Sequence, residues 1–379
     1  MVITNTLIIS AALLVYSVGW STPSHAGESE VLADVHTWQW QHGRKDCETA
    51  QDPAIEVLQV NPSSYILRQN KCSHFEAPFM YFLVGNRRAV LFDTGATADA
   101  DEFPIYQTVL ELIDRLPSAN KNAIEEIVVM HSHHHRDHYA GDEQFSGQPK
   151  ITLVGADRES LATQFGIPVT GTQEVEFNLG GRKIELIPIP GHQRDSVALF
   201  DRQTGWLLTG DTLYPGSIRV KDWGEFKLSI NRLSAFTEQH QVSAILGGHV
   251  EMRSDKPKIY QIGSTFQPKE LPLALQLDEL LELNAKLAKT KNSKTLRFQK
   301  FIISPLNFFE RQLMKVLSKK NAQFEGFRQE ALSRPYFALE ADVSCLELSK
   351  DLSTDQCANP FISHQFQQQG VIYSPVDYV

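Results

Sequence analysis

Five of the thirteen histidines lie in one short stretch, residues 131–138, which reads His-Ser-His-His-His-Arg-Asp-His. The β-branched run Ile-Val-Val at residues 127–129 precedes it and predicts a buried strand that ends where the histidines begin. Imidazole nitrogens and carboxylate oxygens are the donors that zinc binds in proteins. The composition of this stretch therefore predicts a metal site just beyond the end of a strand.

The spacing within this stretch separates two sets of donors. His133 and His135 are two positions apart in extended chain, so their side chains point the same way and can hold one cation at about 2.0–2.1 Å. Asp137 and His138 follow directly and offer a carboxylate and an imidazole to a second cation. A histidine-rich loop without metal is the alternative, but such tracts rarely follow a strand and include an aspartate. The two histidines outside this spacing are expected to be solvated or to support a ligand: His131 and His134.

Residues 132–141 (Ser-His-His-His-Arg-Asp-His-Tyr-Ala-Gly) resemble the T/S-H-x-H-x-D-H-x-G-G signature of the metallo-β-lactamase superfamily, with Ala140 where a glycine is usual. The resemblance implies an α/β protein built as an αββα sandwich, with a hydrolytic site for one or two zinc ions on its upper rim. It implies that His133 and His135 bind the first zinc, whereas Asp137 and His138 bind the second.

Three later positions resemble the remaining ligands of this family, and each follows a short apolar run. His192 stands in a Pro-Gly-His motif and would be the third ligand of the first zinc. Asp211 resembles the aspartate that bridges both metals, because its two oxygens can serve cations about 3.5–4 Å apart. His249 resembles the last ligand of the second zinc. The motif around His192 departs from the family pattern at two positions, Gln193 and Asp195.

Asp93 closes another apolar run, in an Asp-Thr-Gly sequence that resembles the first motif of the family. We expect its carboxylate to orient a metal ligand from behind rather than to bind metal itself; an ordinary turn aspartate is the alternative. Two tyrosines near these motifs, Tyr139 and Tyr214, are candidates for the wall of a substrate pocket or for packed aromatic side chains.

The elements that must position these residues are mainly strands. Apolar runs predict strands at residues 64–67, 79–84, 89–92, 124–130, 151–154, 175–179, 183–188, 206–209 and 244–246. Apolar positions at helical spacing predict a helix at residues 106–116. A chain of 379 residues is long enough for one large domain plus an extension. We place the metallo-β-lactamase-fold domain at residues 27–265 and a mainly helical C-terminal extension at residues 266–379.

The net charge of −9 argues against a nucleic-acid-binding protein, because affinity for phosphate backbones rests on clustered Lys and Arg. Positive charge is concentrated in residues 286–320, where ten Lys or Arg accompany a single Glu, a local charge of about +9. We expect a solvated basic face on helices that pack against the domain or a partner subunit. The alternative is an amphipathic helix in weak contact with an anionic membrane surface.

The N-terminal residues predict export. An apolar run at residues 7–18 precedes a small-x-small motif that ends at Ala26, as in a signal peptide covering residues 1–26, although Lys and Arg are missing before the run. An uncleaved anchor is the alternative. The four cysteines fit a secreted or periplasmic protein with two disulfides; four free thiols are the alternative. Four cysteines allow three pairings, of which Cys47–Cys72 with Cys345–Cys357 is one that we expect.

Together these features favour a binuclear zinc-dependent hydrolase that uses a metal-bridging hydroxide, with Asp137 accepting or relaying a proton. The substrate would be a small molecule with an ester, lactone, thioester or related bond. Hydrolysis of β-lactam antibiotics is the main alternative, although Asp211 stands where the main subclass of β-lactamases carries a cysteine. A non-hydrolytic metal-binding protein or a diiron redox protein is a further alternative.

Overall fold

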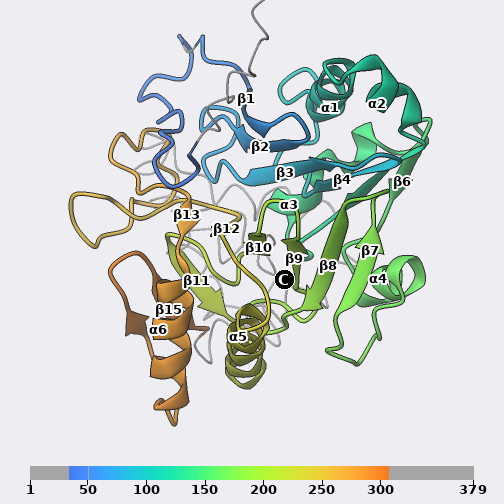
Figure 1. Ribbon diagram of the computed structural model, residues 1–379. Coiled ribbons are helices and arrows are strands. Elements are labelled where there is room, and N and C mark those ends of the chain that lie inside the picture. Colours follow the sequence, from blue (N-terminus) through green and yellow to red (C-terminus); the bar gives the residue numbers. More distant parts are fainter. Residues whose placement is uncertain (1–33, 50, 307–379) are drawn as a thin grey trace, which may run out of the picture. The chain divides into compact units, whose positions relative to one another are not determined.

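Two large β-sheets face each other and carry helices on their outer sides (Figure 1). This arrangement is seen in a computed structural model that describes residues 34–49 and 51–306. All of the described residues belong to one compact unit. The predicted signal peptide and the predicted Cys345–Cys357 pair lie outside the described residues.

The first sheet has six strands in the order β1-β2-β3-β4-β5-β6. The strands from β1 to β4 pair antiparallel, whereas β5 pairs in parallel with β4 and with β6. The apolar runs of the sequence correctly predicted all of these strands except β1. Their bounds are β1 Ile55–Asn61, β2 Ser64–Gln69, β3 Phe79–Val84, β4 Arg88–Phe92, β5 Glu126–Met130 and β6 Ile151–Leu153.

The second sheet has the order β13-β12-β10-β9-β8-β7. Because β8 and β10 are both antiparallel to β9, they run in the same direction, and β12 is parallel to β10. The C-terminal ends of β8, β10 and β12 therefore lie at one edge of the sheet. The strands are β7 Val175–Asn178, β8 Lys183–Pro188, β9 Val197–Asp201, β10 Trp206–Gly210, β12 Ala244–Gly247 and β13 Ala274–Leu275.

A third, small sheet in the order β11-β15-β14 and seven helical segments complete the described chain. The sheet consists of β11 Ser217–Val220, β14 Leu296–Arg297 and β15 Ile302–Pro305. The helices are α1 Ile105–Asp114, α2 Ser118–Ala123, α3 Arg136–Tyr139, the 3₁₀ helix η1 Ala140–Gln144, α4 Arg158–Phe165, α5 Trp223–Thr237 and α6 Leu277–Ala288. Among the described residues, no helix is long and apolar enough to cross a membrane.

The alternation of side chains along each strand divides the interior into layers. On β3, Phe79 and Tyr81 belong to the core between the sheets, whereas Met80 and Phe82 belong to the core shared with α1. A further core packs the outer face of the second sheet against α5 and α6. Because both faces of a sheet are covered, β3 is buried at every position and reads as an unbroken apolar run.

A buried ion pair connects the two sheets. Arg182, just before β8, donates to both carboxylate oxygens of Asp201, at 2.8 and 2.7 Å. The same guanidinium donates to the carbonyl oxygen of Ser63, at 2.7 Å, between β1 and β2 of the first sheet. Burial alone would raise the pKa of Asp201, but the hydrogen bonds and charge of Arg182 outweigh it and lower that pKa.

The segment before β1 is held to the loop between β2 and β3 by a disulfide. Cys47 and Cys72 are bonded, with their Cα atoms 5.3 Å apart, which confirms this predicted pairing. Beside it, Arg68 pairs with Glu270 at 2.7 Å, and Lys71 reaches the same carboxylate at 3.1 Å. These three side chains are almost fully buried, so two cations share one carboxylate in the interior.

Residues 266–306 are the described part of the predicted C-terminal extension. They contain α6 and the strands β13, β14 and β15; β13 extends the second sheet, and β15 pairs with β11. Two of the basic side chains there are used in local packing: Lys286 donates to the carbonyl of Arg297, and Lys300 pairs with Glu279. The domain boundary at residue 265 and the membrane contact through residues 286–320 stay predictions.

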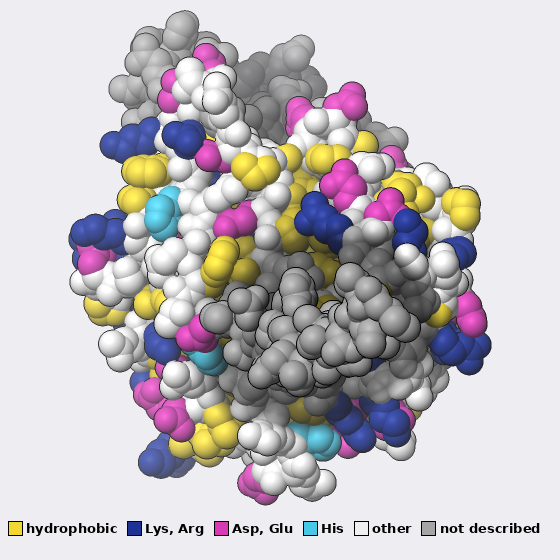
Figure 2. All heavy atoms as spheres, turned by 45° about the horizontal axis from the view of Figure 1, so that its top comes forward, with side chains coloured by type: hydrophobic (Ala, Val, Ile, Leu, Met, Phe, Trp, Pro, Cys, Tyr) yellow, Lys and Arg dark blue, Asp and Glu magenta, His cyan; other side chains and the backbone are white. Residues whose placement is uncertain are grey.

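One face of the molecule shows the surface charge pattern (Figure 2). Lys and Arg side chains are interspersed with Asp and Glu on the described residues of that face, with hydrophobic side chains between them. Charges of both signs therefore share this part of the surface.

Candidate metal centre

The predicted ligands are brought together because they follow strands whose C-terminal ends meet. The loop after β5 carries His133 and His135, and α3, which follows it, carries Asp137 and His138. Asp211 follows β10 directly, and His249 comes two residues after β12. All seven predicted ligand side chains are buried, and they form two clusters that share Asp211.

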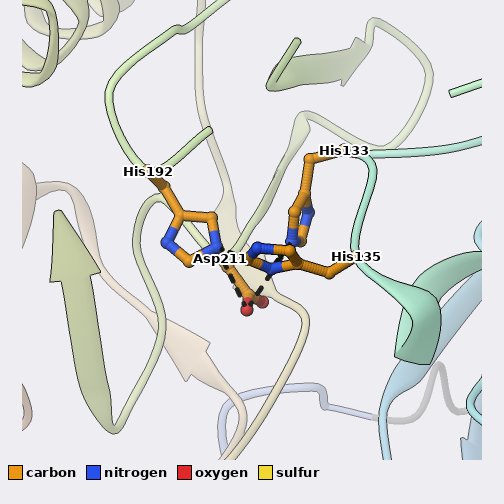
Figure 3. Close-up of side chains that lie close together, drawn as sticks. All are labelled: His133, His135, His192 and Asp211. Carbon is orange, nitrogen blue, oxygen red and sulfur yellow. Dashed lines mark hydrogen bonds and ion pairs between the residues drawn. The ribbon is translucent and has the colours of Figure 1, made fainter. Parts of the chain in front are cut away.

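The first cluster contains His133, His135, His192 and Asp211 (Figure 3). Nδ1 of His135 lies 2.7 Å from Nε2 of His133 and 3.2 Å from Nε2 of His192. Oδ2 of Asp211 lies 3.9 Å from Nε2 of His133 and 3.7 Å from Nε2 of His192. Four donor atoms of the kind that zinc prefers therefore converge on one point.

The second cluster contains Asp137, His138, Asp211 and His249. Oδ2 of Asp137 lies 3.2 Å from Nε2 of His138 and 3.1 Å from Nε2 of His249. Oδ1 of Asp211 lies 3.5 and 3.4 Å from the same two nitrogens. One oxygen of Asp211 thus faces each cluster, which is the geometry that a bridging carboxylate requires.

Backbone and side-chain oxygens hold the outward nitrogens of these rings. Nδ1 of His192 lies 2.7 Å from the carbonyl oxygen of Arg219, and Nδ1 of His249 lies 3.2 Å from that of Glu76. A ring that donates its outward N–H to a carbonyl keeps the lone pair of its inward nitrogen free. These contacts therefore orient Nε2 of both histidines toward the clusters.

Asp93 lies behind His138, on the side away from the clusters. Its Oδ2 is 2.8 Å from Nδ1 of His138, and its carboxylate accepts from the backbone N–H and the hydroxyl of Ser132, at 2.7 and 2.9 Å. Asp93 has a φ of +72°, in the left-handed region that aspartate tolerates better than most residues. It is thus placed to hold both the loop and the ring of His138.

Two glycines allow the loops to approach each other. A Cβ atom on Gly248 would lie 2.6 Å from Oδ1 of Asp211 and 2.8 Å from Cε1 of His138. Gly210 has a φ of +49°, and a Cβ there would lie 2.5 Å from Cβ of Ser132. A side chain at Gly248 would displace Asp211 or His138 of the second cluster. A side chain at Gly210 would displace Ser132, which precedes His133.

The first cluster contains neutral imidazoles, whereas in the second cluster a cation would have to replace the proton of His249. Burial, together with the neighbouring imidazoles, holds the pKa values of His133 and His135 well below the usual range, so both rings are neutral. Burial also opposes the charge on His249, but Asp211 and Asp137 outweigh it and raise its pKa to about 9. Burial would raise the pKa of Asp211, but the neighbouring histidines lower it.

One buried atom independently points to a cation. Oδ1 of Asp211 makes no hydrogen bond within residues 34–49 and 51–306, although it is buried among nitrogens and an ionised carboxylate. A buried carboxylate oxygen without a hydrogen bond is costly unless a cation compensates it. The donor types and this oxygen therefore fit metal ions.

The other predicted residues lie around the centre in different ways. His131 is buried, with Nδ1 3.1 Å from the carbonyl oxygen of His138 and Nε2 3.1 Å from Asp142, whereas His134 is exposed. Tyr214 is buried with its ring 5.5 Å from that of His249, and its hydroxyl donates to Ser217, so it is a packed aromatic side chain.

Comparisons with known proteins agree with this geometry. A family model described as the metallo-beta-lactamase superfamily matches residues 75–249. The chain is 30% identical over 124 residues to a hydroxyacylglutathione hydrolase of Synechococcus sp. (strain JA-2-3B'a(2-13)), covering 32% of this chain and 46% of that relative. It is 31% identical over 99 residues to the acyl-coenzyme A thioesterase MBLAC2 of Gallus gallus, covering 24% of this chain and 35% of that relative.

Among solved structures, a metallo-beta-lactamase from Pontibacter korlensis shares 18% identity, with a TM-score of 0.39; the match covers 62% of this chain and 100% of that one. The chain spans less than half the length of the two curated relatives named above. Residues 75–249 thus belong to the metallo-β-lactamase superfamily, and the two sheets with outer helices form the predicted αββα sandwich.

Proposed function

We propose that this protein is a binuclear zinc-dependent hydrolase of small molecules that carry an ester, lactone, thioester or related acyl bond. The observation that carries the proposal is Asp211, whose two oxygens face two separate clusters of donors. The names of the two curated relatives, a hydroxyacylglutathione hydrolase and an acyl-coenzyme A thioesterase, favour a thioester within this set. Hydrolysis of β-lactams is the alternative and rests on the superfamily alone.

Each cluster would hold one ion. His133, His135 and His192 would bind the first; Asp137, His138 and His249 would bind the second; and Asp211 would contribute to both. When bound, the ions supply a water of lowered pKa and polarise the carbonyl oxygen of the substrate.

Asp137 would orient the attacking water. Burial opposes the charge of this carboxylate, but His138 and His249 outweigh it and hold its pKa well below the usual range. Asp137 is therefore ionised and can accept a hydrogen bond that orients the attacking water. The buried walls of the centre would exclude other water from the reacting atoms.

The test is hydrolysis by the purified protein of a panel containing a hydroxyacylglutathione, an acyl-coenzyme A, a lactone, a carboxylic ester and a β-lactam. Turnover of one acyl class should be lost with a chelator. Asp137→Ala should lower kcat/KM by about 100-fold or more, the range of a positioned acid–base group. The exposed Asp101→Ala is the matched control and should leave turnover unchanged.

Metal content separates the remaining possibilities. Two zinc ions per chain with acyl turnover would support the proposal, whereas two irons would favour a redox protein. Zinc without turnover of any substrate in the panel would favour a metal-binding protein. Turnover of the β-lactam alone would replace the proposed substrate class.

We also propose that the protein is exported, with cleavage after Ala26. The described disulfide between Cys47 and Cys72 supports this, because such bonds persist in oxidising compartments. Sequencing the N-terminus of the protein recovered from the medium or periplasm should give Gly27 as the first residue.

A further inference from the structure

The two residues at which the sequence departs from the family motif after His192 both approach histidines of the stretch at residues 131–138. The buried side-chain amide of Gln193 contacts Nε2 of His135. Asp195 accepts from the backbone N–H of His134, at 3.4 Å. These departures therefore concern the surroundings of the first cluster rather than a distant part of the loop.

His135 differs from the neighbouring ligands in which nitrogen it presents. Its Nδ1 faces the cluster, 2.7 Å from Nε2 of His133, so its Nε2 points away. A neutral ring that binds a cation through Nδ1 carries its proton on Nε2, and that N–H needs an acceptor. For His192 and His249 the outward nitrogen meets a backbone carbonyl oxygen, whereas for His135 it meets Gln193.

The other end of this amide, Oε1, contacts Lys221. Its ammonium donates to Oε1 of Gln193, at 3.0 Å, and the amide nitrogen is the atom nearer to His135. The backbone N–H of Lys221 also donates to the carbonyl oxygen of Gly191, at 2.9 Å, so the lysine is tied to the loop that carries His192.

An ammonium has only donors, whereas an amide oxygen has two lone pairs. In the structure the amide nitrogen faces His135, so Gln193 would accept from Nε2–H of His135 only after a half-turn about its last side-chain bond, which exchanges the amide nitrogen and Oε1. Lys221, on a flexible stem, can follow the oxygen. Gln193 can then accept from both neighbours at once.

We propose that Gln193 is a positioning residue for the first metal: with its amide turned so that Oε1 faces both Lys221 and His135, it accepts from Nε2–H of His135 and so fixes the tautomer that presents Nδ1. This deepens the proposed function, since it assumes that a cation binds at the first cluster. It concerns metal affinity and ring orientation and is independent of the substrate.

The test measures zinc affinity of the full chain by competition with a chromophoric chelator, together with the visible spectrum of the cobalt(II)-substituted protein. Gln193→Leu removes the acceptor at nearly the same size, and one of two equivalents of metal should bind about 10- to 100-fold more weakly, as for other groups that orient a ligand. Gln193→Glu keeps an acceptor that Lys221 can pair with, and its affinity should stay within a few-fold of wild type.

Gln107→Leu, on the exposed face of α1, is the matched control and should bind both equivalents as wild type does. Lys221→Met should weaken the same equivalent by less than Gln193→Leu, which gives a second measure if the leucine variant does not fold. Wild-type affinity in Gln193→Leu, or equal loss in the leucine and glutamate variants, would overturn the proposal and indicate packing alone.

These results are separable from those on activity. A wild-type chain that binds two equivalents but hydrolyses nothing refutes the proposed function, and the comparison of the Gln193 variants still decides this inference. A wild-type chain that binds no metal refutes both.

Discussion

Replacing Gly248 by alanine tests whether the backbone after β12 sets the position of the second cluster. The added Cβ would lie 2.6 Å from Oδ1 of Asp211, which is 0.4 Å inside the 3.0 Å limit below which such contacts hardly occur. Asp211 must therefore shift by at least this amount, or the loop that carries His249 must move.

The expected loss follows from the size of this shift. A misplacement of about 1 Å can cost about 100-fold in rate, so a shift of roughly half that size should lower kcat/KM by about 10-fold, or about 1.4 kcal/mol in the barrier. Overpacking of this kind should also lower the free energy of unfolding by about 1–3 kcal/mol. The second equivalent of metal should bind more weakly than the first, because the shifted oxygen is the one that faces the second cluster.

The assay compares bound metal, kcat/KM on the substrate found in the panel and the melting temperature. Gly224→Ala is the matched control, since a Cβ there would lie 3.4 Å from the nearest atom, Oδ1 of Asp222, at the start of α5. The control should keep both metals and full activity, because alanine favours a helix over glycine. If Gly248→Ala behaves like the control in all three measurements, Gly248 does not position the cluster and the reasoning from contact distances is wrong.

Two further predictions concern buried ions away from the centre. Arg182→Met should lower the free energy of unfolding by about 3–5 kcal/mol in urea, because it leaves the carboxylate of Asp201 buried and unpaired. The pKa of Asp201 is lowered in the folded protein. The difference in unfolding free energy between wild type and Arg182→Met should therefore be largest above about pH 4, where an unfolded carboxyl is ionised, and should shrink as the pH falls below that value. A difference that stays constant with pH would contradict this. Burial lowers the pKa of Lys71 to about 8, so the unfolded chain binds more protons between that pH and about 10.4, and stability should rise with pH there. In Lys71→Met the unfolding free energy should lose this contribution to its rise with pH, which urea unfolding at pH 8 and pH 10 would show. An equal change in unfolding free energy between the two pH values in wild type and variant would refute the prediction.

The sequence predicted most strands of the sandwich because both faces of each sheet are buried. Runs such as that of β3, apolar at consecutive positions, are visible without an alignment, and the strand ends then locate Asp93, Asp211 and His249. The pairing of Cys47 with Cys72 agrees with one of the three pairings that four cysteines allow, and only the structure selects it.

Helix α5 was missed although its sequence carries a signal. Asp222 caps the helix by accepting from the backbone N–H of Glu225, and Phe226, Ile230 and Leu233 follow at helical spacing. An aspartate with a glutamate three positions later, ahead of such apolar spacing, is a recognisable start of a helix.

The oxygens behind the ligands are harder to predict. The carbonyl groups of Glu76 and Arg219 hold His249 and His192, but every residue has a carbonyl group, so residue type carries no information about this role. Only the folded path of the chain brings these atoms to the rings. The partnership of Gln193 with Lys221 is similar, because 28 residues separate them and neither belongs to a familiar metal motif.

The shared carboxylate of Asp211 has a thermodynamic consequence for loading with metal. Because one side chain would contribute to both ions, the free energy of binding the first ion depends on whether the second is present, and by reciprocity the reverse holds to the same extent. The first ion would fix the orientation of the carboxylate, which favours binding of the second ion. The first ion would also withdraw negative charge from the carboxylate, which disfavours binding of the second ion. A titration of the protein with metal should therefore follow a coupled isotherm rather than two independent ones, and the sign of the coupling reports which of these two effects is larger.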